Sequence, residues 1–131
     1  MTPIDHWHQA VRDMDATVLD RILADDVIFH SPVLHTPQEG RALTTMYLVA
    51  AMVSFQDADF HYVKEIVGDR QACLEFMAEI DGITINGVDI ISWNDRGLIT
   101  EFKVMVRPAK GLGKLQETMK AMLDRLNTSE S

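Results

Sequence analysis

Cysteine is nearly absent from this chain, and long apolar runs are missing. Cys73 is the single cysteine among 131 residues, which excludes an internal disulfide and any zinc site that needs several cysteines. It stands in a predicted strand, which is more typical of a buried, unreactive thiol than of a nucleophile. No apolar run approaches the length needed to span a bilayer, so the sequence predicts no membrane-spanning segment.

Positive charge is scarce as well. Twelve Lys and Arg residues stand against 20 Asp and Glu residues, which gives a formal net charge of −8 at pH 7. Because there is no Lys/Arg stripe to contact phosphates, we expect neither nucleic acid nor an anionic membrane as a partner. The N-terminus has no basic segment followed by an apolar one, which argues against a secretory signal and predicts a cytoplasmic protein.

Motifs for cofactors and nucleophiles are also missing. Gly111 and Gly113 follow a predicted strand without the remaining glycine of a dinucleotide-binding loop, and no Ser-His-Asp order with a nucleophile elbow occurs. His30, His35 and Asp89 come nearest to a zinc site, but their spacing matches no metal motif. We therefore predict no cofactor and no metal.

What remains is the composition of an ordinary globular domain, predicted to cover residues 1–131. The hydrophobic fraction is 47% and the charged fraction 24%, and the length allows a core without disulfides or metals. Thr2-Pro3 with Asp5 predicts the start of a helix. Apolar residues at helical spacing predict a second short helix closed by Asp25-Asp26, another over Arg41–Ser54 and one after Pro108.

Five strands are predicted between and after these helices, over 27–30, 60–67, 72–80, 88–93 and 98–107. The last four are separated by turn residues: Gly68-Asp69-Arg70, Asp81-Gly82, Asn86-Gly87 and Asn94-Asp95-Arg96-Gly97. Short turns imply antiparallel neighbours. The predicted fold class is α+β, with N-terminal helices packed on one face of a curved, mainly antiparallel sheet and a helix at the C-terminus.

The predicted strands have two different faces. Over 72–80 one face is apolar, whereas the other mixes Cys73 and Met77 with Glu75 and Glu79. A half-polar face of this kind suits a wet interface between two subunits as well as open solvent. We therefore predict a homodimer formed through this face.

Asp89 is the carboxylate that the sequence singles out. Its neighbours Val88, Ile90 and Ile91 are apolar, so its side chain lies in dry surroundings or faces a cavity. Desolvation raises the pKa of a carboxyl group, and a raised pKa suits a group that exchanges protons near neutral pH. An Asp at a strand edge, meeting water or a backbone N–H, would leave the same pattern.

The order and spacing of these elements resemble the nuclear transport factor 2-like superfamily, in its SnoaL-like and ketosteroid-isomerase-like branch. The resemblance covers nearly the whole domain. It is carried by 23–32, Glu39-Gly40-Arg41, Leu74-Glu75-Phe76, Val88-Asp89-Ile90 and 95–101, ending near Arg107-Pro108. It implies a cone-shaped, cystatin-like roll. Because such a fold hosts many functions, it says less about the chemistry.

The resemblance also implies roles for particular residues. In steroid isomerases of this family a carboxylate just before a proline is the base, and Ser31 occupies that position here, with His30 beside it. The two positions of the oxyanion hole correspond to Trp7 and Asp89. In the polyketide-cyclase branch an aspartate on the pocket strands is the general acid and base, and Asp89 is similar to it. Asp89, Ser31 and His30 are therefore the catalytic candidates.

Aromatic residues are the candidates for the substrate-binding wall of such a cone. They are Trp7, Tyr47, Phe55, Phe76 and Phe102. At these spacings plain core packing leaves the same pattern. A buried Trp7 needs an acceptor for its N–H, and Asp89 is one candidate. His30 facing solvent and Ser31 capping a turn are alternatives to a catalytic role.

Two functions stay open. One is an isomerase or cyclase that uses Asp89 in proton transfer on a small hydrophobic carbonyl compound, without a cofactor. The other is a non-catalytic module that binds a small apolar ligand in its pocket or a protein partner on its sheet. An isolated Asp89 in an apolar strand favours the first, and Ser31 in place of the family's base favours the second.

Overall fold

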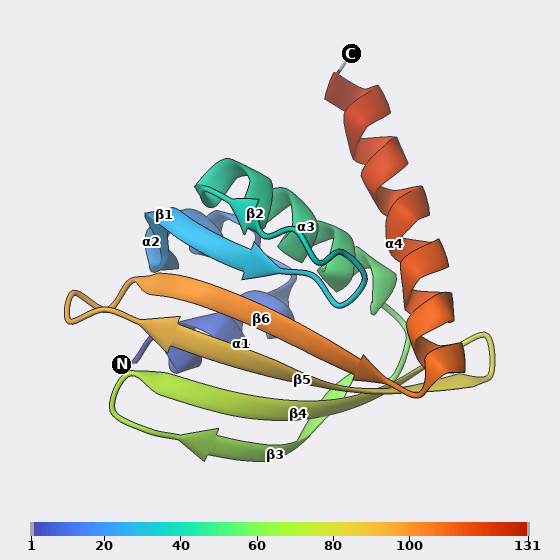
Figure 1. Cartoon of the computed structure of the whole chain (residues 1–131), viewed down its shortest axis with the longest axis horizontal. Helices are drawn as coiled ribbons and strands as arrows, with labels where there is room; N and C mark the ends of the chain where they lie inside the picture. The colour runs from blue at the N-terminus through green and yellow to red at the C-terminus, as the bar shows by residue number, and fades with distance from the viewer. Residues whose placement is uncertain (1, 131) are drawn as a thin grey trace.

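A computed structural model describes residues 2–130 of the chain and the side chains of residues 2–125. Along the chain the elements are α1 (Pro3–Asp13), α2 (Thr17–Ile22), β1 (Leu23–His30), β2 (Gln38–Glu39), α3 (Arg41–Ser54), β3 (His61–Val67), β4 (Gln71–Ile80), β5 (Ile83–Trp93), β6 (Ile99–Arg107) and α4 (Ala109–Glu130) (Figure 1). The strands join in one sheet in the order β2-β1-β6-β5-β4-β3. Its pairs are antiparallel except for β1 with β6, which is parallel.

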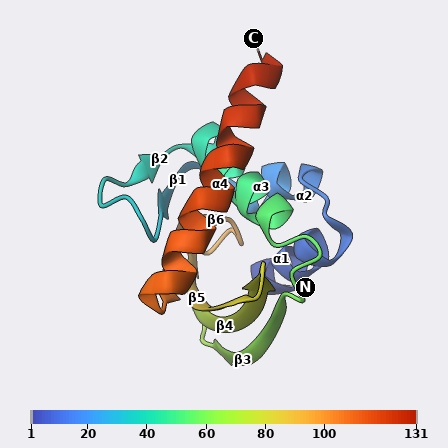
Figure 2. The ribbon, with the colours of Figure 1, turned by 90° about the vertical axis from the view of Figure 1, so that its right-hand side faces the viewer.

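The predicted α+β architecture is confirmed. The sheet curves under α1, α2 and α3, which lie together on one side of it (Figure 2). The long α4 follows β6, packs against α3, β5 and β6, and extends past the body of the molecule (Figures 1 and 2). Among the described residues, no helix combines the length and the apolar character needed to cross a bilayer.

Local capping chemistry explains where α1 begins. The side chain of Thr2 accepts a hydrogen bond from the Asp5 N–H at 3.3 Å, and the Asp5 carboxylate accepts one from the Thr2 N–H at 2.9 Å. This reciprocal capping box satisfies donors that a helix start leaves free. The helix ends before Met14, which has a left-handed conformation with φ 52°. Between these ends α1 buries Ile4, Trp7 and Ala10 toward the sheet.

The boundary between α2 and β1 differs from the prediction. Asp25-Asp26 does not close a helix, because α2 ends at Ile22 and β1 already begins at Leu23. Leu23 pairs with Ile99 of β6, so a strand far along the chain extends β1 backward. Asp25 and Asp26 are exposed on this strand. A polar pair in the sequence therefore marked the solvent side of a strand rather than a helix end.

The hairpin of β4 and β5 also corrects one predicted turn. Its turn is Asp81-Gly82, with φ of 51° and 80°, as predicted. Asn86-Gly87, predicted as a second turn, lies inside β5, where Gly87 pairs with Phe76. A Cβ atom on Gly87 would stand 2.3 Å from Cζ of Phe76. The glycine is thus used for the close packing of an aromatic ring and not for a bend.

The concave face of the sheet carries the core. Its inward side chains alternate with half-exposed ones along β4 and β5, as the pattern of the sequence predicts. Leu74, Phe76, Ile91 and Phe102 are buried there. Asp89 lies on the same face and is only 5% exposed. A carboxyl group therefore stands inside an apolar core.

Candidate active site

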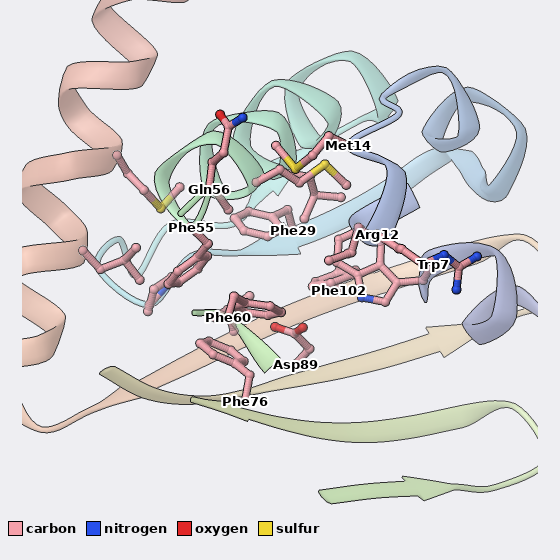
Figure 3. Close-up of a pocket in the computed structure, with 18 of the residues that line it drawn as sticks. Trp7, Arg12, Met14, Phe29, Phe55, Gln56, Phe60, Phe76, Asp89 and Phe102 are labelled. Atoms are coloured by element: carbon pink, nitrogen blue, oxygen red, sulfur yellow. The ribbon is translucent and has the colours of Figure 1, made fainter. Parts of the chain in front are cut away.

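A cavity of about 370 Å³ lies between the concave face of the sheet and the helices (Figure 3). Its wall is largely aromatic and aliphatic, with Phe29 from β1, Phe102 from β6, Phe76 from β4 and Leu115 from α4. Arg12 and Gln56 also line it, but their polar ends point away from Asp89 (Figure 3). Asp89 is the carboxyl group that projects among the aromatic rings.

Three neighbouring strands place Asp89. In β5 it pairs with Leu74 of β4 on one side and with Val104 of β6 on the other. Both partners are apolar, so neither cross-strand neighbour supplies a polar contact. The carboxyl group points toward Phe60 and Phe29 across the cavity (Figure 3). The register of the sheet thus gives this group its dry surroundings.

Two hydrogen bonds link Asp89 to α1. The Tyr62 hydroxyl donates to Oδ2 of Asp89 at 2.7 Å, and Nε1–H of Trp7 donates to the Tyr62 hydroxyl oxygen at 2.8 Å. The sequence offered Asp89 as a direct acceptor for Trp7. In the structure Tyr62 stands between the two, because β3 is an edge strand whose side chains contact α1: the ring of Tyr62 packs edge-on against His8, with centroids 5.3 Å apart. The Trp7 ring packs edge-on against Phe102, with centroids 4.8 Å apart.

Burial sets the acidity of the site. It raises the pKa of Asp89 from 3.8 to about 7, and the hydrogen bond from Tyr62 opposes that rise. Burial also raises the pKa of Tyr62 well above its usual 10, and the nearby Asp89 charge adds to this. At neutral pH, Tyr62 therefore keeps its proton, whereas Asp89 is divided between its neutral and ionised forms.

The structure brings four of the five predicted wall residues to the cavity. Trp7, Phe55, Phe76 and Phe102 line it together with Asp89. Tyr47 packs against Phe29, with ring centroids 5.6 Å apart, and is not among the lining residues. The aromatic residues of this region thus form both core and cavity wall.

His30 and Ser31 lie apart from Asp89. Nε2 of His30 is 3.2 Å from the Glu101 carboxylate, and both side chains are partly exposed. The Ser31 hydroxyl accepts a hydrogen bond from the Val33 N–H at 3.1 Å, which is a local turn contact. Neither residue lines the cavity. The position of the family's base is therefore occupied here by a side chain that serves the backbone of its own loop.

Sequence reasoning missed two aromatic wall residues, Phe29 and Phe60, and the hydrogen-bonding residue Tyr62. Tyr62 lies in a strand that the sequence predicts, but the pairing of β3 with β4 shifts between Tyr62 and Lys64. Such a bulge interrupts the two-residue alternation of side chains, which is the pattern used to predict the face of the sheet on which a residue lies. The chemistry of the side chains could have indicated Tyr62, because a buried Tyr or Trp needs a hydrogen-bond partner for its polar end.

Among the side chains that the structure describes, no group of three or more His, Cys, Asp or Glu residues is placed to hold a metal ion.

The curved sheet, the helices over its concave face and the cavity between them define an α+β protein of the nuclear transport factor 2-like, or cystatin-like, class. The model of the SnoaL-like domain matches residues 4–102. The chain belongs to this SnoaL-like family, and the resemblance stated from the sequence is confirmed. No curated protein matches the sequence.

Solved structures agree with this assignment. A steroid delta-isomerase from Pseudomonas aeruginosa is similar over 96% of this chain and 92% of its own, with 33% identity and a TM-score of 0.91. A protein with a cystatin-like fold from Silicibacter pomeroyi DSS-3 follows with 29% identity, a TM-score of 0.84 and coverage of 91% and 83%. The epoxide hydrolase/cyclase-like enzyme SalBIII of salinomycin pyran ring formation shares the fold, with 16% identity, a TM-score of 0.63 and coverage of 80% and 88%.

Proposed function

We propose that this protein is an isomerase or cyclase that moves a proton on a small hydrophobic carbonyl compound, with Asp89 as the group that gives and takes the proton. One observation carries the proposal: a carboxyl group with a pKa raised to about 7 lines a largely apolar cavity, among its aromatic rings. A general acid or base works best when its pKa lies near the working pH. The similarity to a steroid delta-isomerase at 33% identity supports the same class of reaction.

The cavity suits a ligand with an apolar body and one oxygen. Its volume of about 370 Å³ is in the range of small-molecule sites. Its aromatic walls offer dispersion and exclude water from the carboxyl group, which strengthens any hydrogen bond formed there. A carbonyl oxygen can accept a hydrogen bond from neutral Asp89, whereas an acidic C–H beside a carbonyl can lose its proton to the ionised form.

Exchanging the carboxyl group for an amide tests this role. A β,γ-unsaturated 3-oxosteroid serves as the probe, because its isomerisation forms a conjugated enone that is followed by ultraviolet absorbance. We expect Asp89→Asn to lose at least about 10²-fold in kcat, because the amide cannot exchange the proton. Glu79→Gln is the matched control, since Glu79 is exposed on the other face of β4 and should keep full activity. Equal rates for wild type and Asp89→Asn would contradict the proposal.

A second candidate is a non-catalytic module that holds a small apolar ligand. It is favoured by the placement of Ser31, whose hydroxyl is engaged in its own loop and leaves the cavity without the family's base. The same steroid distinguishes the two functions. Under the second, wild type and Asp89→Asn both bind the probe, and neither moves its double bond or exchanges its α-hydrogens with deuterated water.

We also propose a homodimer through the convex face of the sheet. Ile66 of β3 and Met105 of β6 are 63% and 49% exposed, and a shallow groove between them includes Cys73 and Val88. Burying such side chains favours association. Sedimentation at micromolar concentration should show a dimer for the wild type and a monomer for Ile66→Glu. Leu34→Glu, at an exposed loop position away from this face, should remain dimeric. A monomeric wild type would rule the interface out.

A further inference from the structure

The hydrogen bonds from Trp7 to Tyr62 to Asp89 can run in one direction only. An indole N–H donates and cannot accept, so the Tyr62 oxygen is the acceptor in the 2.8 Å contact with Trp7. That leaves the single hydroxyl hydrogen of Tyr62 for the 2.7 Å contact with Oδ2 of Asp89. If Tyr62 instead accepted from both neighbours, its own hydrogen would have no acceptor among the described residues. An unpaired donor in this part-buried position is costly, which rules against that arrangement.

The two oxygens of Asp89 are therefore not equivalent. Oδ2 receives the Tyr62 hydrogen, which makes it an acceptor in both protonation states. Oδ1 has no hydrogen-bond partner among the described residues, although Asp89 is only 5% exposed and lines the cavity. The carboxyl group stands among the rings of Phe60, Phe76 and Phe102 (Figure 3). A polar atom that has no protein partner and opens onto a cavity points to a ligand atom.

We propose that Oδ1 of Asp89 is the atom that carries and exchanges the proton, and that Tyr62, oriented by Trp7, is the positioning residue that holds Oδ2 as a permanent acceptor. This inference rests on the proposed function and names the reacting atom within it. Tyr62 acts through Asp89, since it is not among the residues that line the cavity.

The proton balance follows from this assignment. When Asp89 acts as an acid, the O–H bond at Oδ1 breaks, the proton passes to the ligand, and the electron pair stays on the carboxylate. Tyr62 then stabilises that charge through Oδ2. When Asp89 acts as a base, Oδ1 takes a proton from a C–H next to the ligand carbonyl, and the C–H electron pair becomes part of an enolate. Returning the proton to another carbon of the ligand completes an isomerisation without any further reactant.

Few other charged groups face this carboxyl group. From β3 it meets Tyr62, while its partners on β4 and β6 are the apolar Leu74 and Val104. The helices α3 and α4 bring apolar side chains to the cavity. The remaining titratable residues that line it belong to its rim: Arg12, Asp57 and Asp59. Tyr62 is thus the polar group placed to govern the proton on Asp89.

The ligand must match a single polar atom. While Asp89 is neutral, the interior offers one donor at Oδ1, so a bound molecule needs a hydrogen-bond acceptor at that end and apolar surface elsewhere. While Asp89 is ionised, Oδ1 is a base, so the ligand must present an acidic C–H to it. An enolisable carbonyl compound with an apolar body meets both conditions. An alcohol or an amine in that place could not serve as the carbon acid.

Infrared spectroscopy distinguishes the two oxygens. At about pH 5 Asp89 is neutral, and its C=O stretching band is assigned by its loss in Asp89→Asn. If Oδ1 carries the proton, the C=O group is at Oδ2 and accepts from Tyr62, so the band moves to higher wavenumber in Tyr62→Phe. If the proton were on Oδ2, the free C=O would be at Oδ1 and the band would stay in place. An unmoved band, or no band lost in Asp89→Asn, would overturn the proposal.

Carboxyl titration by NMR gives an independent readout of the positioning role. We expect Tyr62→Phe to raise the pKa of Asp89 by about one to two units, because the ionised form loses a charge-assisted hydrogen bond. Trp7→Phe should raise it by less, because it only loosens Tyr62. The double variant should match Tyr62→Phe alone, since Trp7 acts through Tyr62. Additive pKa shifts in the double variant, or no pKa shift in Tyr62→Phe, would contradict the proposed hydrogen-bond order from Trp7 through Tyr62 to Asp89.

These readouts are independent of turnover, so they separate this proposal from the proposed function. Loss of steroid isomerisation in Asp89→Asn with an unmoved infrared band would keep the function and remove the assignment to Oδ1. An infrared band that shifts in Tyr62→Phe, together with unchanged turnover in Asp89→Asn, would keep the assignment to Oδ1 and remove the proposed function. Tyr62→Phe removes one oxygen and keeps the ring that packs beside Phe60, at a centroid distance of 5.2 Å, so the fold is retained for these measurements.

Discussion

Asp89→Asn should be markedly more stable than the wild type at about pH 8, although it lacks the central polar group of the site. The pKa of Asp89 is about 7 in the folded protein, against 3.8 for an ordinary carboxyl group. Between these values the folded state binds more protons than the unfolded one, so the contribution of Asp89 to stability is full below about pH 4 and is lost as the pH rises to about 7. The full effect is about 4 kcal/mol, from about three pKa units at 1.36 kcal/mol each.

Urea unfolding across this pH range measures the effect. The free energy of unfolding of Asp89→Asn should be nearly flat where that of the wild type falls, because an amide oxygen still accepts from Tyr62 and no charge has to be buried. Glu79→Gln, which changes an exposed carboxyl group on the other face of β4, should follow the wild-type curve. Parallel curves for wild type and Asp89→Asn would show that the buried carboxyl group does not titrate in this range.

Gly87→Ala should destabilise the protein by about 1–3 kcal/mol or more. The added Cβ would lie 2.3 Å from Cζ of Phe76, and its distances to two further ring atoms are below 3 Å. The Phe76 ring is 1% exposed and packs against Phe55 and Phe60, with centroids 5.5 and 4.9 Å away, so it has little room to move. Because the same ring lines the cavity, the substitution should also weaken ligand binding.

Gly113→Ala is the matched control for this substitution. Gly113 lies in α4, and a Cβ there would meet no atom within 4 Å. Alanine favours a helix over glycine by up to about 1 kcal/mol, so this variant should be slightly more stable than the wild type. Thermal or urea unfolding of both variants checks the pair. Equal effects of the two substitutions would mean that Phe76 does not pack over Gly87 as the structure shows.

These two predictions have a common physical origin. The same closely packed wall that leaves no room beside Gly87 also keeps water from Asp89. The protein thereby loses folding stability as the pH rises from about 4 to 7, and it holds a carboxyl group in a state that can exchange a proton near neutral pH. Proteins often accept such a cost at sites of function, where a preorganised but unfavourable arrangement is maintained by the packing around it.

The parts of the fold that were predictable depend on neighbours in the sequence. The helix over Arg41–Ser54 was predicted with its observed bounds, because its apolar spacing and the preceding Gly40 are local signals. The Asp81-Gly82 turn is likewise local chemistry. The start of β1 at Leu23 was not predictable, since it depends on pairing with Ile99 of β6. Asn86-Gly87 was misinterpreted as a turn because Phe76, which requires the glycine, lies on another strand.

The candidate site divides in the same way. By itself the sequence determined the α+β class, the family and the choice of Asp89, because a lone carboxylate between apolar strand residues is visible in a few consecutive letters. Only the tertiary structure decided its partner. Tyr62 is 27 residues away and follows no readable alternation, and it reaches Oδ2 only when the sheet curves and β3 lies beside α1. Local patterns therefore identified the group that can hold a proton, whereas the direction of its hydrogen bonds is a property of the folded protein.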